Sequence, residues 1–309
     1  MNKNTLDIII VGGGPIGLLS LIRGCNAQLN GLLFESRDTL GGQLTELYPK
    51  KEIVDIPGIP MILAEDYIKK LELAYYQTSQ SIKIKLQESV KKIETMDDII
   101  FVTTNIGVYP CKHLVIATGL GVYTPRTMGI LEEENFDHIL YSVKDYQFLS
   151  GKRVVIMGGG DSAIDWAKMM SYVSDDVSLV HRRREFRGDI ETIAHIDKIH
   201  ILTPYIPLEL IGNDNHLEGI VIQHVENGEV IRLPADYIFV NYGNIPLSDT
   251  FGFEKLGMGI KVDDRYHVIG NHIYAIGDIA SYPNKKKRIA PAMVEIDSVM
   301  QEIIENCKN

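Results

Sequence analysis

Short apolar runs that end in glycine-rich turns recur along the chain and predict an α/β fold. The apolar run 8–11 leads into glycines at 12–14, then into a helical pattern and a second apolar run. The same succession begins again at residue 154. A strand, a helix and a second strand in this order form a unit whose two strands are parallel. We therefore predict two βαβ units, over about 7–35 and about 152–184.

Weaker patterns of the same kinds fill the rest of the chain. Apolar residues at helical spacing predict a helix over about 66–79 and a C-terminal helix over about 291–306. Alternating runs between about 82 and 110 predict the strands of a small antiparallel insertion. Apolar runs predict further strands at 114–117, 220–222, 237–240 and 273–276.

The order of the two βαβ units determines the expected domain organisation. Because the second unit lies between the first and a C-terminal piece, the simplest assembly makes the first domain discontinuous. We expect a first domain of 1–117 and 245–309, with a second domain, 118–244, inserted into it. Both are expected to be Rossmann-like, three-layer dinucleotide-binding domains. The connections expected to act as hinges are 118–124 and 241–246.

Composition restricts the class of protein. A chain of 309 residues with 45% hydrophobic and 23% charged residues is typical of soluble globular proteins. The net charge of −10 argues against general binding to nucleic acid or anionic membranes. The sequence has no apolar run of the roughly 18–20 residues that a membrane span needs. The first apolar run lacks a small-residue cleavage site, so we interpret it as a strand and not as a secretion signal.

The cysteines predict neither a redox motif nor a metal site. Cys25, Cys111 and Cys307 are isolated, and the first two fall where core residues are expected. Reduced cysteines are typical of a cytoplasmic protein. Because His, Cys and carboxylate residues do not cluster at metal-ligand spacing, we expect no metal.

Both glycine-rich turns have the spacing of a dinucleotide fingerprint. In the first, Gly12 permits a tight turn, Gly14 lets the backbone approach a pyrophosphate, and Gly17 lets the helix pack closely. The pyrophosphate would lie at the helix N-terminus, where free N–H groups favour an anion. In the second copy, Gly158 and Gly160 come first, and Ala163 takes the third role.

The residues after the two units carry opposite charge. The first unit ends in Glu35, an acid that can accept hydrogen bonds from free ribose hydroxyls. The second ends in a basic cluster, His181 to Arg184, in which Arg182 and Arg183 can bind a 2′-phosphate. The first site is therefore predicted to hold a dinucleotide such as FAD, and the second to hold NADPH. A flavin and a nicotinamide on one chain indicate an electron-transfer protein.

The order of these motifs resembles that of thioredoxin-reductase-like flavoproteins, over about residues 7–278. Within that group the chain is most similar to the ferredoxin (flavodoxin)–NADP(+) reductases of type 2. The motifs that carry this resemblance are Gly12 to Gly17, Gly41-Gly42-Gln43-Leu44, 44–49, 54–58, Ala117-Thr118-Gly119, 158–166, 181–183, 241–243 and 274–278.

The resemblance implies a role for each residue of the FAD site. Gln43 would reach the flavin, and Tyr48 would stack on the isoalloxazine. Asp278 would accept a hydrogen bond from the ribityl chain. The alternatives are that Gln43 caps a turn and that Tyr48 belongs to the core. Val90 would meet the adenine, and Tyr123 takes the place of a family aromatic near the cofactor. The expected FAD set is Gly12, Gly14, Pro15, Gly17, Glu35, Gly42, Gln43, Leu44, Tyr48, Val90, Ala117, Thr118, Gly119, Tyr123, Gly277 and Asp278.

For NADPH, Arg187 lies close enough in the following loop to join the phosphate-binding arginines, and His181 is expected to orient the loop or stack near the adenine and not to act as an acid or base. The alternative is an ordinary solvated basic turn. The expected NADPH set is Gly158, Gly160, Asp161, Ser162, Ala163, His181, Arg182, Arg183 and Arg187.

The chain differs at three places from the families that it resembles. Thioredoxin reductases carry a redox Cys-x-x-Cys ahead of the second fingerprint, where this chain has no cysteine over 141–146. A related group, thought to reduce bacillithiol disulfide, has a cysteine within the first fingerprint, where this chain has Pro15. Both disulfide-reductase readings are therefore disfavoured. The third departure is the end at Asn309, without the family's C-terminal extension, and we expect a flavin face that is more open or is covered by another subunit.

The predicted activity is hydride transfer from NADPH to FAD, followed by one-electron steps to a small redox protein, ferredoxin or flavodoxin. No catalytic side chain is required, because the cofactors carry the chemistry. Lys285, Lys286, Lys287 and Arg288 are the expected docking patch for an acidic partner. An NADPH oxidase or quinone reductase is one alternative, and a flavin redox sensor without turnover is another. The resemblance also implies a homodimer.

Overall fold

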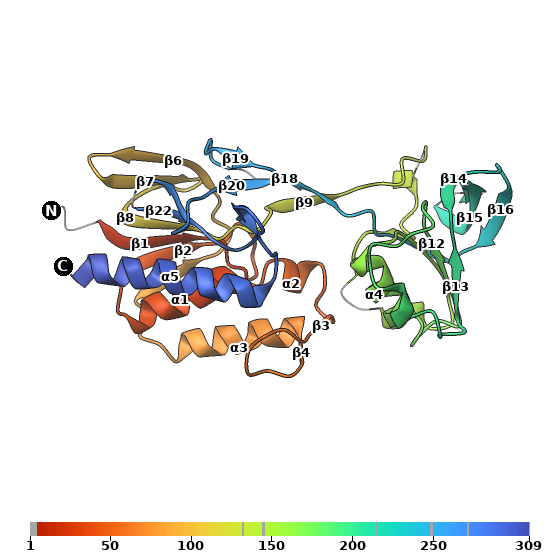
Figure 1. Cartoon of the computed structure of the whole chain (residues 1–309), viewed down its shortest axis with the longest axis horizontal. Coiled ribbons are helices and arrows are strands. Elements are labelled where there is room, and N and C mark those ends of the chain that lie inside the picture. The colour runs from red at the N-terminus through yellow and green to blue at the C-terminus, as the bar shows by residue number, and fades with distance from the viewer. Residues whose placement is uncertain are drawn as a thin grey trace. The chain divides into compact units, whose positions relative to one another are not determined.

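The structure is a computed structural model and describes residues 5–131, 133–143, 146–213, 215–247, 250–270 and 272–308; at 122–124, 244–247 and 269 only the backbone is described. Contacts divide the chain into two compact units. Unit 1 consists of Met1–Val122 with Pro246–Asn309, and unit 2 of Tyr123–Ile245. The segments that connect the units, β9 (Val122–Pro125) and β18 (Asn244–Leu247), pair as a two-stranded sheet (Figure 1).

Unit 1 is built on an eight-stranded sheet. Its strands are β1 (Leu6–Val11), β2 (Gly31–Phe34), β5 (Ile82–Lys85), β6 (Val90–Met96), β7 (Ile99–Thr104), β8 (Val108–Ile116), β21 (His267–Ile269) and β22 (Ile273–Ala275). The order is β21-β22-β8-β1-β2-β5, with β6 and β7 added to β8. In the centre, β1 is parallel to β2 and β8, and Ile10 lies opposite Leu33 and Val115. Residues 8–11 are buried, as an apolar run in a parallel sheet must be.

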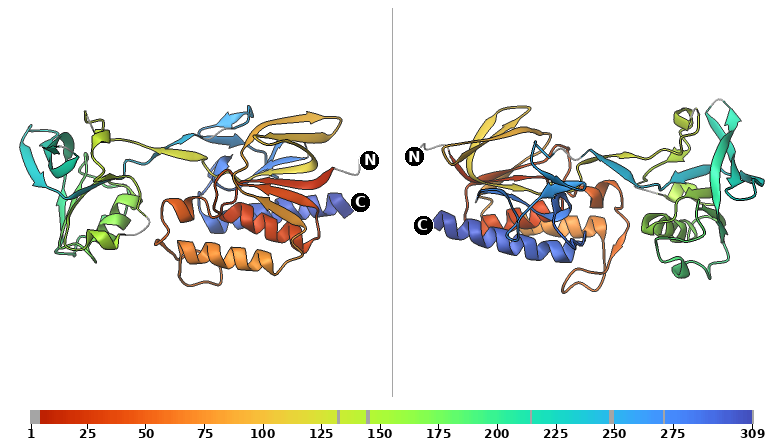
Figure 2. Two further views of the ribbon diagram at one scale, coloured as in Figure 1. Left: turned by 180° about the vertical axis from the view of Figure 1, so that it is seen from behind. Right: turned by 45° about the horizontal axis from the view of Figure 1, so that its top comes forward.

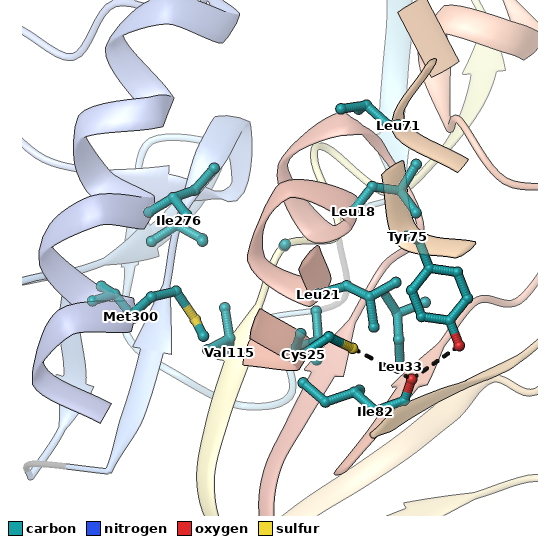
Figure 3. Packing of buried hydrophobic residues seen from close by; sticks show 14 of the residues in the cluster. Leu18, Leu21, Cys25, Leu33, Leu71, Tyr75, Ile82, Val115, Ile276 and Met300 are labelled. Carbon is teal, nitrogen blue, oxygen red and sulfur yellow. Dashed lines mark hydrogen bonds between the residues drawn. The ribbon is translucent and has the colours of Figure 1, made fainter. Parts of the chain in front are cut away.

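Three helices cover one face of this sheet: α1 (Pro15–Asn26), α3 (Ala64–Tyr76) and α5 (Ile289–Lys308) (Figures 1 and 2). Buried Leu18, Leu21 and Cys25 recur every three or four residues along α1, so they form one apolar face. Figure 3 shows this face beside Ile82 of β5 and Met300 of α5. The packing holds the N-terminal ends of α1 and α5 in fixed positions against the sheet.

Short elements complete unit 1 around the ends of the central strands. The strands β3 (Glu52–Ile53) and β4 (Ile62–Leu63) form a two-stranded sheet outside the main sheet. A three-stranded sheet has the order β19-β20-β23, with β19 (Lys255–Leu256), β20 (Gly259–Lys261) and β23 (Ala280–Ser281). The remaining short elements are the helix α2 (Gln43–Glu46) and the 3₁₀ helix η4 (Gly277–Ile279).

Unit 2 repeats the parallel arrangement on a smaller scale. Its main sheet has the order β10-β17-β11-β12-β13, and the paired strands are parallel throughout. A separate antiparallel sheet has the order β14-β15-β16. The elements are β10 (Ile139–Leu140), β11 (Arg153–Met157), α4 (Asp161–Met170), β12 (Asp176–Val180), β13 (Ile199–Leu202), β14 (Tyr205–Asn213), β15 (His216–His224), β16 (Val230–Pro234), β17 (Tyr237–Val240) and the 3₁₀ helices η1 (Glu133–Asn135), η2 (Gln147–Leu149) and η3 (Ile190–Thr192).

The predicted βαβ units and both predicted helices are confirmed, although the helix bounds differ by a few residues at each end. The antiparallel insertion is confirmed for β6, β7 and β8. It is wrong for 82–85, because β5 joins the main sheet parallel to β2, with Ile82 opposite Gly31. A run of four alternating residues does not reveal whether its partner strand is near or far in sequence.

Candidate dinucleotide sites

The first glycine turn has one open position between two closed ones. A Cβ added at Gly17 would lie 1.9 Å from the Gly12 carbonyl oxygen, so the helix packs directly on the turn. Gly12 has a φ of +109°, and a Cβ there would lie 2.5 Å from the Ala117 carbonyl oxygen. At Gly14, by contrast, an added Cβ meets no atom within 4 Å. The backbone of Gly14 therefore faces space that a pyrophosphate can occupy.

The free end of α1 lies at this open position. Pro15 is its first residue, Gly14 precedes it, and Gly14 caps the helix with no side-chain hydrogen bond. Proline suits the first position because it has no N–H to satisfy there. The N–H groups of the first turn and the helix dipole can therefore bind a phosphate group.

Glu35 is buried at the end of β2, beside the first fingerprint. Its Oε2 accepts the N–H of Gly13 at 2.7 Å, and its Oε1 accepts the N–H of Arg37 at 3.0 Å. The Ser36 hydroxyl also donates to Oε1, at 3.2 Å, so the acceptor capacity left for a ribose hydroxyl is the second lone pair of Oε2. Arg37 was not among the predicted site residues. Only its position two residues after the strand-ending acid could have indicated it.

The short helix α2 brings Gly42, Gln43 and Leu44 to the same edge of the sheet. A Cβ added at Gly42 would lie 3.3 Å from the Gly14 Cα, and one at Gly119 would lie 3.5 Å from the Gln43 Nε2. Three motifs distant in sequence therefore meet around the open position. Tyr48, just beyond α2, is half-buried.

Two polar groups at the site fit a ligand. The Thr118 Oγ1 is buried, and no group of the described residues hydrogen-bonds to it. Asp278 follows Gly277 in η4 and is half-buried. Burial raises the pKa of Asp278, partly offset by Lys287 and Lys285. An unpartnered hydroxyl and a half-buried acid beside an open glycine turn suit the hydroxyl groups of a dinucleotide.

Three residues of the predicted FAD set remain, Val90, Ala117 and Tyr123. Val90 begins β6, is half-buried and packs against the apolar cluster on the second face of the sheet. Ala117 closes the strand end, donating its N–H to the Val11 carbonyl at 2.8 Å. The side chain of Tyr123 lies outside the described residues.

The second glycine turn holds the basic loop against the end of β11. A Cβ added at Gly159 would lie 2.4 Å from the His181 ring, and at Gly160 the nearest atom is the Arg187 Nη2, at 4.0 Å. The Arg187 N–H also donates to the Gly159 carbonyl at 2.8 Å. Ala163 is fully buried in the first turn of α4, after Asp161 and Ser162. The loop that begins at His181 is therefore fixed beside the turn, as a phosphate site requires.

The cations of this loop are not equivalent. Arg182 and Arg183 are exposed, whereas Arg184 donates to Glu226 at 3.0 and 2.6 Å. Burial and the surrounding arginines lower the pKa of His181, although its bond to the Glu185 carbonyl opposes them. The imidazole is therefore neutral near pH 7, and it packs on Phe186 with 4.9 Å between ring centroids.

One predicted docking residue is wrong. Lys285 has only 7% of its side chain exposed and forms an ion pair with the buried Glu295. Lys286, Lys287 and Arg288 are exposed. Consecutive basic residues in a loop cannot be told apart by sequence, but Glu295 of α5 pairs with Lys285 and so buries that side chain.

A family model described as pyridine nucleotide-disulphide oxidoreductase matches residues 6–301. The chain belongs to this family. It is 36% identical to a ferredoxin–NADP reductase of Streptococcus agalactiae, covering 98% of this chain and 94% of the relative. It is 38% identical to one of Acholeplasma laidlawii, covering 96% and 93%.

Solved structures show the same fold. A thioredoxin reductase of Lactococcus lactis has a TM-score of 0.84 at 24% identity, covering 97% of this chain and 98% of that one. One of T. acidophilum has a TM-score of 0.83 at 22% identity, covering 99% and 100%. The predicted thioredoxin-reductase-like α/β fold is thereby confirmed. In this family member the described residues contain no group of three or more potential metal ligands, and none of its described helices is long and apolar enough to cross a membrane.

Proposed function

We propose that this chain is a ferredoxin (flavodoxin)–NADP(+) reductase, which passes electrons from NADPH through FAD to a small redox protein. The observation that carries the proposal is the contrast between two similar glycine turns. One lies beside the acid Glu35, and the other beside the exposed Arg182 and Arg183. Full-length relatives named ferredoxin–NADP reductase support the same activity.

The proposal assigns one cofactor to each domain. FAD binds the domain of 1–117 and 245–309, between the Gly14 turn and Asp278, and NADPH binds the inserted domain of 118–244. When bound, the FAD accepts a hydride from NADPH and releases electrons singly. The protein positions the cofactors. Arg182 and Arg183 select the 2′-phosphate by charge-assisted hydrogen bonds, and the neutral His181 orients their loop.

Anaerobic stopped-flow mixing with NADPH and with NADH tests this function, with flavin absorbance as the signal. Rapid bleaching by NADPH and much slower bleaching by NADH are expected. Equal rates with both nucleotides would contradict the phosphate-binding role of the arginines. A protein that cannot be reconstituted with FAD would refute the function as a whole.

We further propose that Lys286, Lys287 and Arg288 dock an acidic electron acceptor. All three are exposed and lie in the loop between β23 and α5, shortly after Asp278. Exposed charges of one sign steer association at a rate that falls with salt. Replacing Lys286 and Arg288 by glutamine should slow ferredoxin or flavodoxin reduction and flatten its salt dependence, with no change for a small dye; Lys287 is retained because its charge acts on Asp278. Oxygen uptake without a protein acceptor serves as the control for oxidase activity. Equal losses with protein and dye would refute docking at this loop.

Assembly and location are also proposals. We propose a homodimer in the cytoplasm, in agreement with the resemblance to thioredoxin-reductase-like proteins. The three cysteines are all free, as is usual in reducing compartments. Light scattering coupled to size-exclusion chromatography tests the dimer, and a monomeric mass would refute it.

A further inference from the structure

A buried ion pair lies beneath the turn that carries Asp278. Glu295, in the second turn of α5, is fully buried, and Lys285 has 7% of its side chain exposed. Removing two opposite charges from water is costly unless further hydrogen bonds satisfy them. Stability alone therefore does not explain why an ion pair is buried at this position.

Glu295 holds both ends of the segment around Asp278. Its Oε2 accepts the N–H of Gly277 at 2.8 Å, and its Oε1 accepts the Tyr282 hydroxyl at 2.7 Å. The Lys285 ammonium donates to the same Oε1 and lies 4.9 Å from the Tyr282 ring centroid. One carboxylate thus ties the residue before Asp278 and two residues after it to α5.

The anchored turn also contacts the first fingerprint. A Cβ added at Gly277 would lie 3.2 Å from Ile16, in the first turn of α1. A displacement of the turn would therefore move Asp278 relative to the open position at Gly14. The ion pair thus controls geometry on the ligand side of the site.

Charge adds a second reason. Burial raises the pKa of Asp278, the ammonium groups of Lys287 and Lys285 lower it, and the neighbouring Glu295 raises it. Loss of the Lys285 charge would raise the pKa of Asp278 further, so that Asp278 takes up a proton more readily as the pH falls. A protonated Asp278 would offer a ligand hydroxyl a weaker acceptor.

We propose that Lys285 and Glu295 are positioning residues for the FAD site. They hold the Gly277–Asp278 turn against α5 and thereby fix the position of Asp278 at the FAD site. This inference rests on the proposed function, because it assumes that unit 1 binds FAD.

Titration of the apoprotein with FAD tests the inference, using quenching of flavin fluorescence between about pH 5 and pH 8. The variants are Lys285→Met, Glu295→Gln and the double variant, with Lys286→Met as a control that removes an exposed neighbouring charge. A buried hydrogen-bonding group that has lost its charged partner typically weakens a binding equilibrium about 10- to 100-fold. We expect each single variant to weaken FAD binding about tenfold or more, and the double variant to be no weaker than the worse single variant.

The pH profile separates positioning from mere folding. Binding by Lys285→Met should weaken more steeply as the pH falls than binding by the wild type or by Lys286→Met, and Lys285→Arg should restore the wild-type profile. Glu295→Gln keeps an acceptor for Gly277 and so remains informative if Lys285→Met does not fold. Wild-type affinity in Glu295→Gln, or a Lys285→Met profile equal to that of Lys286→Met, would overturn the inference. A wild-type protein that does not bind FAD would instead remove the proposed function itself.

Discussion

Two glycines of the first turn are expected to fail in different ways when replaced by alanine. At Gly17 the new methyl carbon would lie 1.9 Å from the Gly12 carbonyl oxygen, which belongs to the packed backbone. Overpacking of this kind typically costs about 1–3 kcal/mol of unfolding free energy. We expect Gly17→Ala to lie at the upper end, because the helix must move as a whole. In a domain of this size, about 3 kcal/mol lowers Tm by roughly 6–12 °C.

Gly14→Ala should leave the apoprotein stable but impair FAD binding. The position has a φ of −72°, which alanine adopts readily, and an added Cβ meets no atom within 4 Å. The change in unfolding free energy should stay within about 1 kcal/mol of zero, because a poorer helix cap and a less flexible unfolded chain offset each other. The methyl group would instead enter the space assigned to the pyrophosphate. Loss of one or two charge-assisted hydrogen bonds, at about 1.5–3 kcal/mol each, corresponds to roughly a 100-fold weaker Kd.

Calorimetric unfolding of the apoprotein with and without FAD distinguishes the two variants. At FAD equal to about 100 times the wild-type Kd, the cofactor stabilises the wild type by about 2.7 kcal/mol. After a 100-fold loss of affinity, the same FAD stabilises Gly14→Ala by only about 0.4 kcal/mol. A normal FAD-dependent stabilisation of Gly14→Ala would refute the placement of the pyrophosphate. An unchanged apoprotein Tm in Gly17→Ala would refute the packing.

The remaining predictions concern charged side chains. Replacing Arg182 and Arg183 by glutamine should lower the preference for NADPH over NADH about 10- to 100-fold in flavin-reduction rates, whereas Arg184→Gln should not, because Arg184 pairs with Glu226. Burial alone would lower the pKa of His267, but carboxylates 2.9 and 3.0 Å from its ring nitrogens raise it above the usual value. The stability that His267 contributes is therefore complete below about pH 6.5 and declines as the pH rises through the raised pKa. In urea unfolding, the loss of unfolding free energy caused by His267→Gln should shrink between about pH 6 and pH 9. A loss that stays constant with pH would contradict this. Arg153, which donates hydrogen bonds to Asp236, lowers the pKa of that carboxyl to about 2. Its contribution should be present above about pH 4 and lost as the pH falls toward about 2, and Asp236→Asn should lack this acid-sensitive part of the unfolding curve.

The sequence by itself determined the repeated units and their chemistry. The runs 8–11 and 154–157 are apolar throughout, which is typical of strands covered on both faces, and each leads directly into its glycines. Turn, helix and following strand are local features, so their order along the chain indicates them. The acid after one unit and the cations after the other are likewise adjacent in sequence to the strands that position them.

The tertiary structure alone decided which groups contact one another and which charged side chains are buried in ion pairs. Gln43 approaches Gly119, and Gly42 approaches Gly14, because separate strands end at one edge of the sheet. The partner of 82–85 is a strand about fifty residues earlier, and local alternation carries no information about that distance. Lys285 and Lys286 are neighbours with identical side chains, yet only Lys285 is drawn inward by Glu295. The physical reason is the same in each case: burial and pairing depend on elements packed against a residue, and these come from distant parts of the chain.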